Sequence, residues 1–233
     1  MKKILVRELS GWSAGELLWM AFSLAAVTGL SLHWGDSAIG IIAALTGMMY
    51  TLLAGKGKIS CYAFGLVNTP LYAYTAWRCG YYGDAALNVY YFAMMFIGIA
   101  SWRRHRHEDA KRGVIKTRLS ARGRTILAAA LLSCTAVLWA ILIAAGGSRP
   151  FCDALTNTLS VAAMVLTVRR AVEQWTMWIA VDAIEVFMWW KVWAESGNSV
   201  SLLSMWMLFL ANGIWLRHKW LADMHEDRLP RKN

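Results

Sequence analysis

The sequence predicts an all-α polytopic membrane protein with about eight transmembrane helices. Of its 233 residues, 58% are hydrophobic and only 16% are charged, whereas about a quarter of a soluble domain is usually charged. The mean hydropathy is +0.41. This composition excludes a disordered chain, a disulfide scaffold and a water-soluble enzyme. Since a bilayer-spanning helix needs about 20 apolar residues, eight spans would fill most of the chain.

Eight apolar segments are the candidate spans, and each has roughly the required length. They cover residues 13–33, 37–54, 59–77, 85–102, 125–145, 151–168, 175–195 and 199–216. We interpret the first as an extra N-terminal helix, the next three and the last three as two bundles, and the fifth as a linker. The expected divisions are 1–36, 37–102, 103–145, 146–220 and 221–233.

The basic residues predict the orientation in the membrane. Of the 24 Lys and Arg residues, all but Arg78, Arg149 and Lys191 lie at one side of the predicted spans. Because cytoplasmic loops retain Lys and Arg, both termini are expected in the cytoplasm. The long basic connection 103–124 is interpreted as a topology-setting loop, with contact to anionic lipid or a partner as the alternative. No nucleic-acid partner is expected from this charge distribution.

The N-terminus carries no evident cleavable signal peptide. Residues 1–10 are mixed in character, and Glu16 interrupts the start of the first apolar run, so the first span is expected to stay as an anchor. No Gly-rich nucleotide loop occurs either, and ATP hydrolysis by this chain is not expected.

Cysteine and histidine positions argue against a metal or cofactor site. The five histidines lie at span ends or in loops, so no ligand set is expected inside the bundle. The cysteines have no paired spacing and are expected to be free apolar side chains, although a disulfide between Cys79 and Cys152 stays open.

Two short resemblances suggest an internal repeat. Residues 74–77 resemble 190–193, and residues 102–105 resemble 215–218. Both members of each pair would run in the same direction through the membrane. This pattern is typical of parallel repeats related by an axis along the membrane normal, with a pocket or path between them.

The seventh span contains two acids near its middle, Asp182 and Glu185. A carboxylate at that depth costs about 2.5–3.5 kcal/mol on insertion scales, so it must face a protein interior or a water-filled cavity. Helical spacing places Trp178 and Trp189 on the same face. The structural alternative is that the acids pair with Lys191 or bond across helices.

A face that alternates indole rings and carboxylates suits a flat ring that carries positive charge. A pyridinium and a thiazolium are both candidates, and neutral ligands stay open because tryptophan also stacks on them.

Polar residues of the first bundle offer a complementary set. Asn68 and Tyr72 lie on the third span, where Pro70 is expected to kink the helix, and Asn88 and Tyr91 lie on the fourth. Their amides and phenols could bind ribose hydroxyls or a carboxamide. The alternative for each asparagine is a helix-to-helix hydrogen bond worth about 0.6 kcal/mol. Asn212 on the last span has the same two interpretations.

These residues together resemble the nicotinamide riboside transporter (PnuC) family. The resemblance spans roughly residues 37–220 and is carried by the segments 70–74, 81–84, 88–92, 169–170, 173–175, 178–182 and 213–215.

The resemblance implies a vitamin-precursor transporter of the bacterial inner membrane. It further implies two three-helix bundles joined by a linker helix, as in SWEET proteins, often in a homotrimer. Transport in the family is facilitated diffusion, and a cytoplasmic kinase traps the substrate by phosphorylation. Because relatives carry thiamine, riboflavin or deoxynucleosides, the cargo stays open between nicotinamide riboside and thiamine.

Two other classes of function use the same acids. In a membrane-embedded enzyme, Asp182 and Glu185 would serve as acid and base, but no nucleophile with a partner base and no buried histidine accompanies them. In a proton-coupled carrier, either acid would relay protons.

Overall fold

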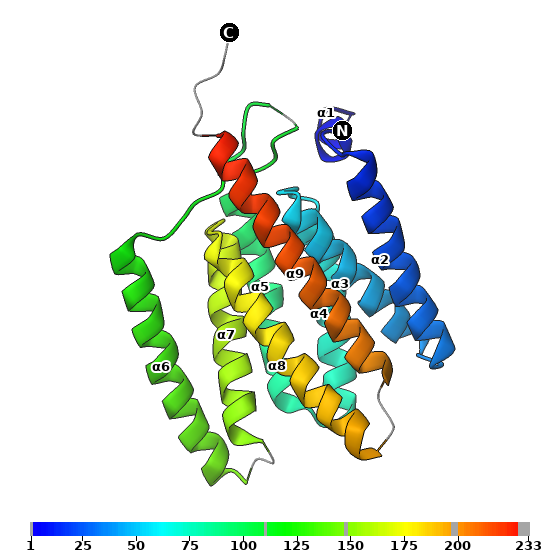
Figure 1. The fold of residues 1–233 in the computed structure, drawn as a ribbon, viewed down its shortest axis with the longest axis vertical. Coiled ribbons are helices and arrows are strands. Elements are labelled where there is room, and N and C mark those ends of the chain that lie inside the picture. Colours follow the sequence, from blue (N-terminus) through cyan, green and yellow to red (C-terminus); the bar gives the residue numbers. More distant parts are fainter. Residues whose placement is uncertain (1, 110, 147–148, 197–199, 228–233) are drawn as a thin grey trace. The chain divides into compact units, whose positions relative to one another are not determined.

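The computed structural model describes residues 2–109, 111–146, 149–196 and 200–227 (Figure 1). The described residues form nine helices. They are α1 (Lys2–Leu9), α2 (Ala14–His33), α3 (Ala38–Gly55), α4 (Cys61–Arg78), α5 (Tyr82–Arg104), α6 (Ala121–Ala144), α7 (Pro150–Val168), α8 (Glu173–Ser196) and α9 (Val200–Glu226).

The eight long helices correspond to the eight expected spans. Five of them, α2, α3, α5, α6 and α7, are long and apolar enough to cross a membrane by length and composition. The three that fall outside this group, α4, α8 and α9, include Asn68, Asp182 and Asn212. Several of the residues expected to bind a ligand therefore lie on the helices that are not among the most apolar ones.

Two helical segments were not expected from hydropathy. The short helix α1 precedes the first span, and α9 continues ten residues beyond position 216. In α9 the reason is packing: Trp220 is fully buried, and its ring meets that of Trp175 at 5.8 Å. Residues 228–233 of the expected cytoplasmic tail lie outside the described residues.

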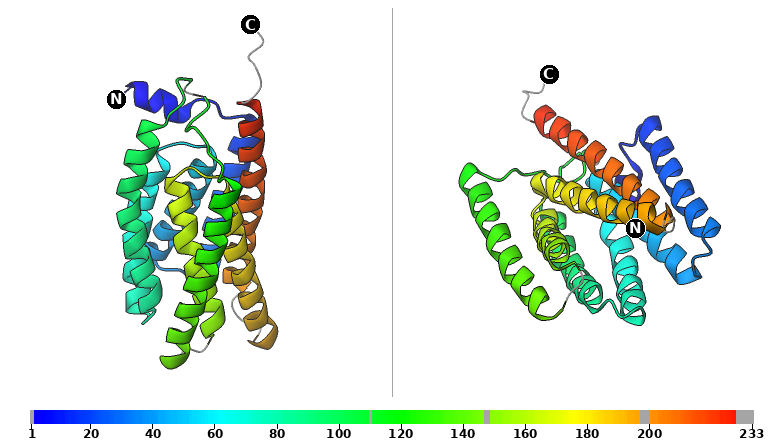
Figure 2. Two further views of the ribbon diagram at one scale, coloured as in Figure 1. Left: turned by 90° about the vertical axis from the view of Figure 1, so that its left-hand side faces the viewer. Right: turned by 60° about the horizontal axis from the view of Figure 1, so that its bottom comes forward.

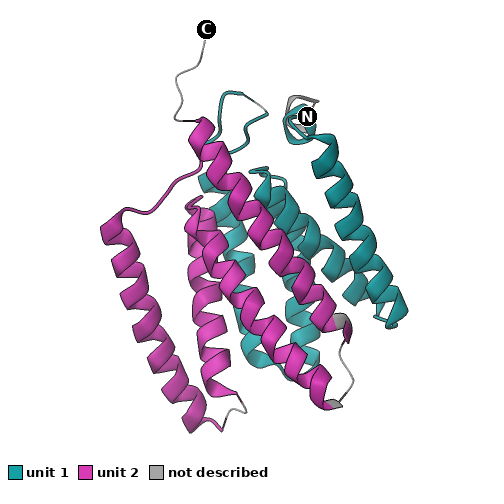
Figure 3. Cartoon of the chain, in the orientation of Figure 1, with its two compact units in different colours: residues 1–115 teal, residues 116–233 magenta. Residues whose placement is uncertain are grey.

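The chain divides into two compact units, residues 1–115 and 116–233 (Figure 3). In the first unit, α4 packs against both α3 and α5, and α2 lies along α3 (Figure 2). In the second unit, α8 packs against both α7 and α9, and α6 lies along α7. Each unit is thus a three-helix bundle with one further long helix beside its first member, and the first unit also contains the short helix α1.

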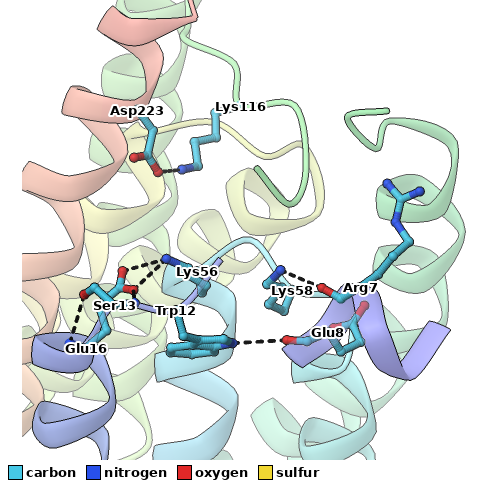
Figure 4. A network of polar contacts seen from close by, with 9 residues as sticks. All are labelled: Arg7, Glu8, Trp12, Ser13, Glu16, Lys56, Lys58, Lys116 and Asp223. Carbon is cyan, nitrogen blue, oxygen red and sulfur yellow. Dashed lines mark hydrogen bonds and ion pairs between the residues drawn. The ribbon is translucent and has the colours of Figure 1, made fainter. Parts of the chain in front are cut away.

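Glu16 helps to begin the first long helix. Its carboxylate accepts a hydrogen bond from the backbone N–H of Ser13, and the Ser13 hydroxyl accepts one from the Glu16 N–H, which makes a capping box. The same carboxylate forms an ion pair with Lys56 at 2.7 Å (Figure 4). The acid that interrupts the apolar run therefore fixes the start of α2 and ties it to the end of α3.

The N-terminal segment also holds the turn between α3 and α4 (Figure 4). Lys58 is 2% exposed, and its ammonium donates a hydrogen bond of 2.7 Å to the Arg7 carbonyl. Burial lowers the pKa of Lys58 below its ordinary value. The Glu8 carboxylate accepts hydrogen bonds from both the backbone N–H and the hydroxyl of Ser60. A lysine that hydropathy assigns to a solvated loop is in fact part of a packed polar contact.

Candidate functional site

The acidic face of α8 is graded in its burial. Asp182 is 7% exposed, while Trp178, Glu185 and Trp189 are half-buried and Trp193 is exposed. The expectation that Asp182 faces a protein interior is therefore confirmed. It lies well inside a 24-residue helix, more than two turns from either end.

The second unit supplies no opposite charge for Asp182. The carboxylate forms no hydrogen bond or ion pair with any described residue, and the charge that acts on it is that of Glu185, of the same sign. The alternative in which the acids pair with Lys191 is wrong, because the Lys191 ammonium lies over the Phe187 ring, 5.6 Å from its centre, and is paired with no described acid.

A glycine of α9 lies beside this carboxylate. A Cβ atom placed on Gly213 would lie 3.6 Å from the Asp182 Oδ2 and 3.2 Å from the Ile179 Cγ1. The absence of a side chain at Gly213 lets α9 approach α8 closely at the level of the acid. Its neighbour Asn212 is fully buried and donates to the Leu208 carbonyl at 3.0 Å, within its own helix.

Trp178 is connected to the next helix of the same unit. Its indole N–H lies 3.4 Å from the Thr167 hydroxyl on α7. Trp189, two turns beyond Asp182, is half-buried. Trp178 thus has a hydrogen-bond partner within its own unit, whereas no hydrogen bond links the Trp189 indole to a described residue.

In the first unit, Asn68 bridges two helices. Its amide donates a hydrogen bond of 2.7 Å to the Ala43 carbonyl on α3, and a Cβ atom on Gly47 would lie only 3.0 Å from the same nitrogen. The helix-to-helix bond foreseen as the structural alternative is therefore present. The carbonyl oxygen of the Asn68 amide appears in no hydrogen bond among the described residues.

The other expected residues of the first unit differ in their surroundings. Asn88 is buried and donates to the Asp84 carbonyl at 2.9 Å, one turn earlier in α5. Tyr91 is half-buried, with its ring 5.8 Å from that of Tyr90. Tyr72 is 43% exposed. The nine expected site residues therefore form two sets, four on α4 and α5 and five on α8 and α9.

Sequence reasoning missed a polar stripe on α7. Thr156, Ser160 and Thr167 are buried, on the same side of the helix as the apolar residues Ala163 and Met164. Their spacing of four and seven residues is the signal that could have found them, because it marks one helix face. The Thr167 hydroxyl is the one that reaches the indole of Trp178.

The side chains of these two sets are suited to binding a ligand by its charge and shape. No cluster of three or more metal-ligating side chains occurs in the described part of the chain, and all four cysteines are free thiols. What distinguishes the second set is the buried carboxyl group of Asp182, with a second acid and two indole rings on the same helix. Such a group favours a cationic partner, since a carboxylate without one is costly at this depth.

The chain is similar in sequence to known transport proteins. The family model described as "Nicotinamide mononucleotide transporter" matches residues 37–222. A nicotinamide riboside transporter PnuC from Neisseria mucosa is 34% identical over 92% of this chain and 84% of its own length. The PnuC protein of Haemophilus influenzae is 30% identical over 91% of this chain and 92% of its own length.

A solved structure agrees with these sequence matches. The crystal structure of the vitamin B3 transporter PnuC superposes with a TM-score of 0.81 at 33% identity, and the match covers 94% of this chain and 96% of that one. The chain therefore resembles these transporters both in its sequence and in its polytopic all-α fold. The chain belongs to the nicotinamide mononucleotide transporter family, which includes the PnuC proteins.

Proposed function

We propose that this protein imports nicotinamide riboside across the bacterial inner membrane by facilitated diffusion. The relatives named above are nicotinamide riboside transporters, and they match this chain over most of its length. The observation that carries the assignment to this chain's own residues is the buried, unpaired carboxylate of Asp182.

The charge of the site supports the riboside over the mononucleotide. Nicotinamide riboside carries a positively charged pyridinium ring, whereas the mononucleotide adds a phosphate. On the described part of α8, Lys191 lies nine residues beyond Asp182 and is exposed. A phosphate near Asp182 and Glu185 would thus add negative charge where two acids already repel each other. A pyridinium ring would supply the missing counter-charge.

In this proposal each residue has a separate role. Asp182 and Glu185 balance the ring's positive charge, and Trp189 stacks on the ring face. Trp178, whose indole N–H lies 3.4 Å from the Thr167 hydroxyl, borders the ring on the α7 side. The first unit offers polar groups of the kind that a ribose and a carboxamide require: Asn88, Tyr91, Tyr72 and the amide oxygen of Asn68. Asn212 supports the α8–α9 contact beside Asp182.

The membrane arrangement belongs to the same proposal. Both termini lie in the cytoplasm, as the distribution of basic residues indicates. A cytoplasmic kinase traps the imported riboside by phosphorylation, and the protein is a homotrimer, as the family resemblance implies. The triplets α3–α5 and α7–α9 alternate in their access to the two sides.

A binding screen on the purified protein tests the cargo. Nicotinamide riboside, thiamine and nicotinamide mononucleotide are titrated in parallel by calorimetry, with the neutral reduced form of the riboside as a charge control. We expect tight binding of nicotinamide riboside only. Preferential binding of thiamine would transfer the assignment to a thiazolium cargo, and equal binding of the reduced riboside would remove the role of charge.

Uptake into liposomes tests the mode of transport. Substrate entry should follow the riboside gradient and continue when the pH gradient is collapsed. Entry that stops on collapse would identify a proton-coupled carrier instead, with Asp182 or Glu185 as the relay.

A further inference from the structure

A basic patch surrounds the start of α6 in the second unit. We define it as Arg118, Arg122, Arg124 and Arg169, all of which are exposed. The loop before α6 lies beside the α7–α8 turn, because the Thr117 hydroxyl donates to the Arg169 carbonyl at 2.9 Å and the Thr117 N–H donates to the Arg170 carbonyl. Arg118 follows directly in the chain.

The patch contains more positive charge than its surroundings neutralise. Among the described residues, Glu173 is the one acid that pairs with a member of the patch: Arg124 lies 3.5 Å from this carboxylate, which also accepts hydrogen bonds from the Leu119 N–H at 3.2 Å. The side chains of Arg118, Arg122 and Arg169 form no hydrogen bond or ion pair with any described residue. Three guanidinium groups are therefore available to an anion.

Two arginines elsewhere in the chain differ, because hydrogen bonds hold their side chains. Arg7 donates to the His107 carbonyl, and Arg217 donates to the Thr176 hydroxyl at 3.2 Å. Moreover, Arg122 and Arg124 occupy the first turn of α6, which contains no acid. Positive charge is unfavourable at the amino end of a helix. An anion beside these residues would relieve that repulsion.

The helix below the patch has a surface suited to acyl chains. Among the residues of α6, only Thr135 is buried, and the exposed side chains include Ile126, Leu132 and Val137. A molecule that satisfies both features has a negatively charged head and an apolar tail.

We propose that the basic patch binds the phosphate headgroup of an anionic phospholipid whose acyl chains lie along α6. The guanidinium groups of Arg118, Arg122 and Arg169 hold the phosphate oxygens through charge-assisted hydrogen bonds. Basic groups next to transmembrane helices commonly recognise anionic lipids in this way. The site is separate from the residues that we assign to the cargo, so it stands or fails independently of them.

The test compares two double variants with the same change of charge. Arg118→Gln with Arg122→Gln removes two members of the patch. Arg103→Gln with Arg104→Gln removes two exposed arginines from the last turn of α5, outside the patch. Binding of phosphatidylglycerol to the purified protein in neutral detergent is measured by native mass spectrometry, with phosphatidylcholine and inorganic phosphate as comparison ligands.

We expect the α6 variant to lose about thirtyfold in affinity for phosphatidylglycerol, and the α5 variant less than about threefold. Because Arg122 repels the helix dipole, the α6 variant should keep its melting temperature, which excludes unfolding as the cause. Equal losses in the two variants, or no loss in either, would overturn the site. So would equal binding of inorganic phosphate, or a change of oligomeric state without a change in lipid binding.

Discussion

The α3–α4 turn of the first unit and the α7–α8 turn of the second have the same backbone hydrogen bonds, 113 residues apart. Five bonds recur in each turn. In the first turn the donors are Lys56, Gly57, Lys58, Cys61 and Tyr62, and in the second they are Arg169, Arg170, Ala171, Gln174 and Trp175. Gly57 and Arg170 both adopt positive φ, at 71° and 61°. The two bundles are thus built on one repeated turn.

The aromatic cores next to these turns repeat as well. Tyr62 meets Trp102 at 5.2 Å in an edge-to-face arrangement, and Trp175 meets Trp220 at 5.8 Å in the same geometry. Trp220 is therefore the counterpart of Trp102. The sequence comparison that matched Trp102 with Trp215 is displaced by five residues, because the last helices do not keep the spacing of the turns.

The units differ at the polar residues deeper in the helices. In the first unit, Asn68 on α4 donates to a backbone carbonyl of α3, while Asn88 donates to a carbonyl one turn earlier in its own helix. At the position equivalent to Asp182, the first unit has Thr69, whose hydroxyl donates to the Gly65 carbonyl. Only the second unit thus places a carboxylate there. The two units therefore share a fold but differ in the acid at this position. This difference is expected if the second unit recognises the charged ring of a ligand whose other end is neutral.

The largest expected effect tests the equivalence of the aromatic cores. Trp102→Ala and Trp220→Ala should each lower the free energy of unfolding by about 3–5 kcal/mol, because both side chains are fully buried. Chemical unfolding in detergent measures the loss, with the matching Phe substitutions as controls. If one variant cost less than about 1 kcal/mol, the two cores would not be equivalent.

Asp182→Asn tests the charge difference between the units. It should weaken nicotinamide riboside binding about tenfold to a hundredfold, since it removes about 1.5–3 kcal/mol of interaction with a charged group. The control is Thr69→Ser at the equivalent position, which should leave affinity unchanged. Calorimetry measures the affinity of the variant for the charged and for the reduced riboside. An equal loss of affinity for both would contradict a role of Asp182 in balancing the charge of the ring.

Two glycines of the last helices test how closely each unit packs. A Cβ atom on Gly98 would lie 2.2 Å from the Tyr62 ring, within the first aromatic pair, whereas the nearest atom to one on Gly213 would be 3.2 Å away. Gly98→Ala should therefore lower the free energy of unfolding by about 1–3 kcal/mol. Gly213→Ala should change it by less than about 1 kcal/mol, as the gain in helix propensity offsets a small shift of Ile179. Equal melting temperatures would show that the aromatic pair yields freely.

Glu8→Gln tests the contact that holds the first turn. Loss of the carboxylate weakens the hydrogen bonds from Ser60 at the start of α4, and we expect a loss of about 0.5–2 kcal/mol in the free energy of unfolding. Glu173→Gln probes the carboxylate at the start of α8, which accepts from Leu119. A thermal melt in detergent compares the two, and a loss confined to Glu173→Gln would mean that α1 does not stabilise its turn.

The smallest effect concerns pH. Burial lowers the pKa of Lys58 in the folded state, so at lower pH the unfolded state binds the proton more readily. The resulting destabilisation is present below the folded pKa and disappears as pH rises toward the ordinary value of about 10.4. As the pH rises from neutral to alkaline, the melting temperature of the wild type should therefore rise relative to that of Lys58→Met. A difference that stays constant with pH would contradict this.

The helices could be predicted from the sequence because hydropathy and length dictate where a chain can cross a bilayer. The same applies to the depth of Asp182 and to its shared face with Trp178, which follow from helical spacing alone. The family, too, was recognisable from short motifs on α4, α5 and α8. These features depend on residues near one another in the chain.

Other features depended on contacts between distant segments, and only the tertiary structure decided them. Glu16 and Lys56 are 40 residues apart, so no local pattern could turn an interruption of the first span into an ion pair. The same reason applies to the bond from Asn68 to Ala43 and to the burial of Lys58. The packing of α7, α8 and α9 likewise decides that no described residue of its unit pairs with Asp182, because an acid is unpaired only with respect to all of its neighbours.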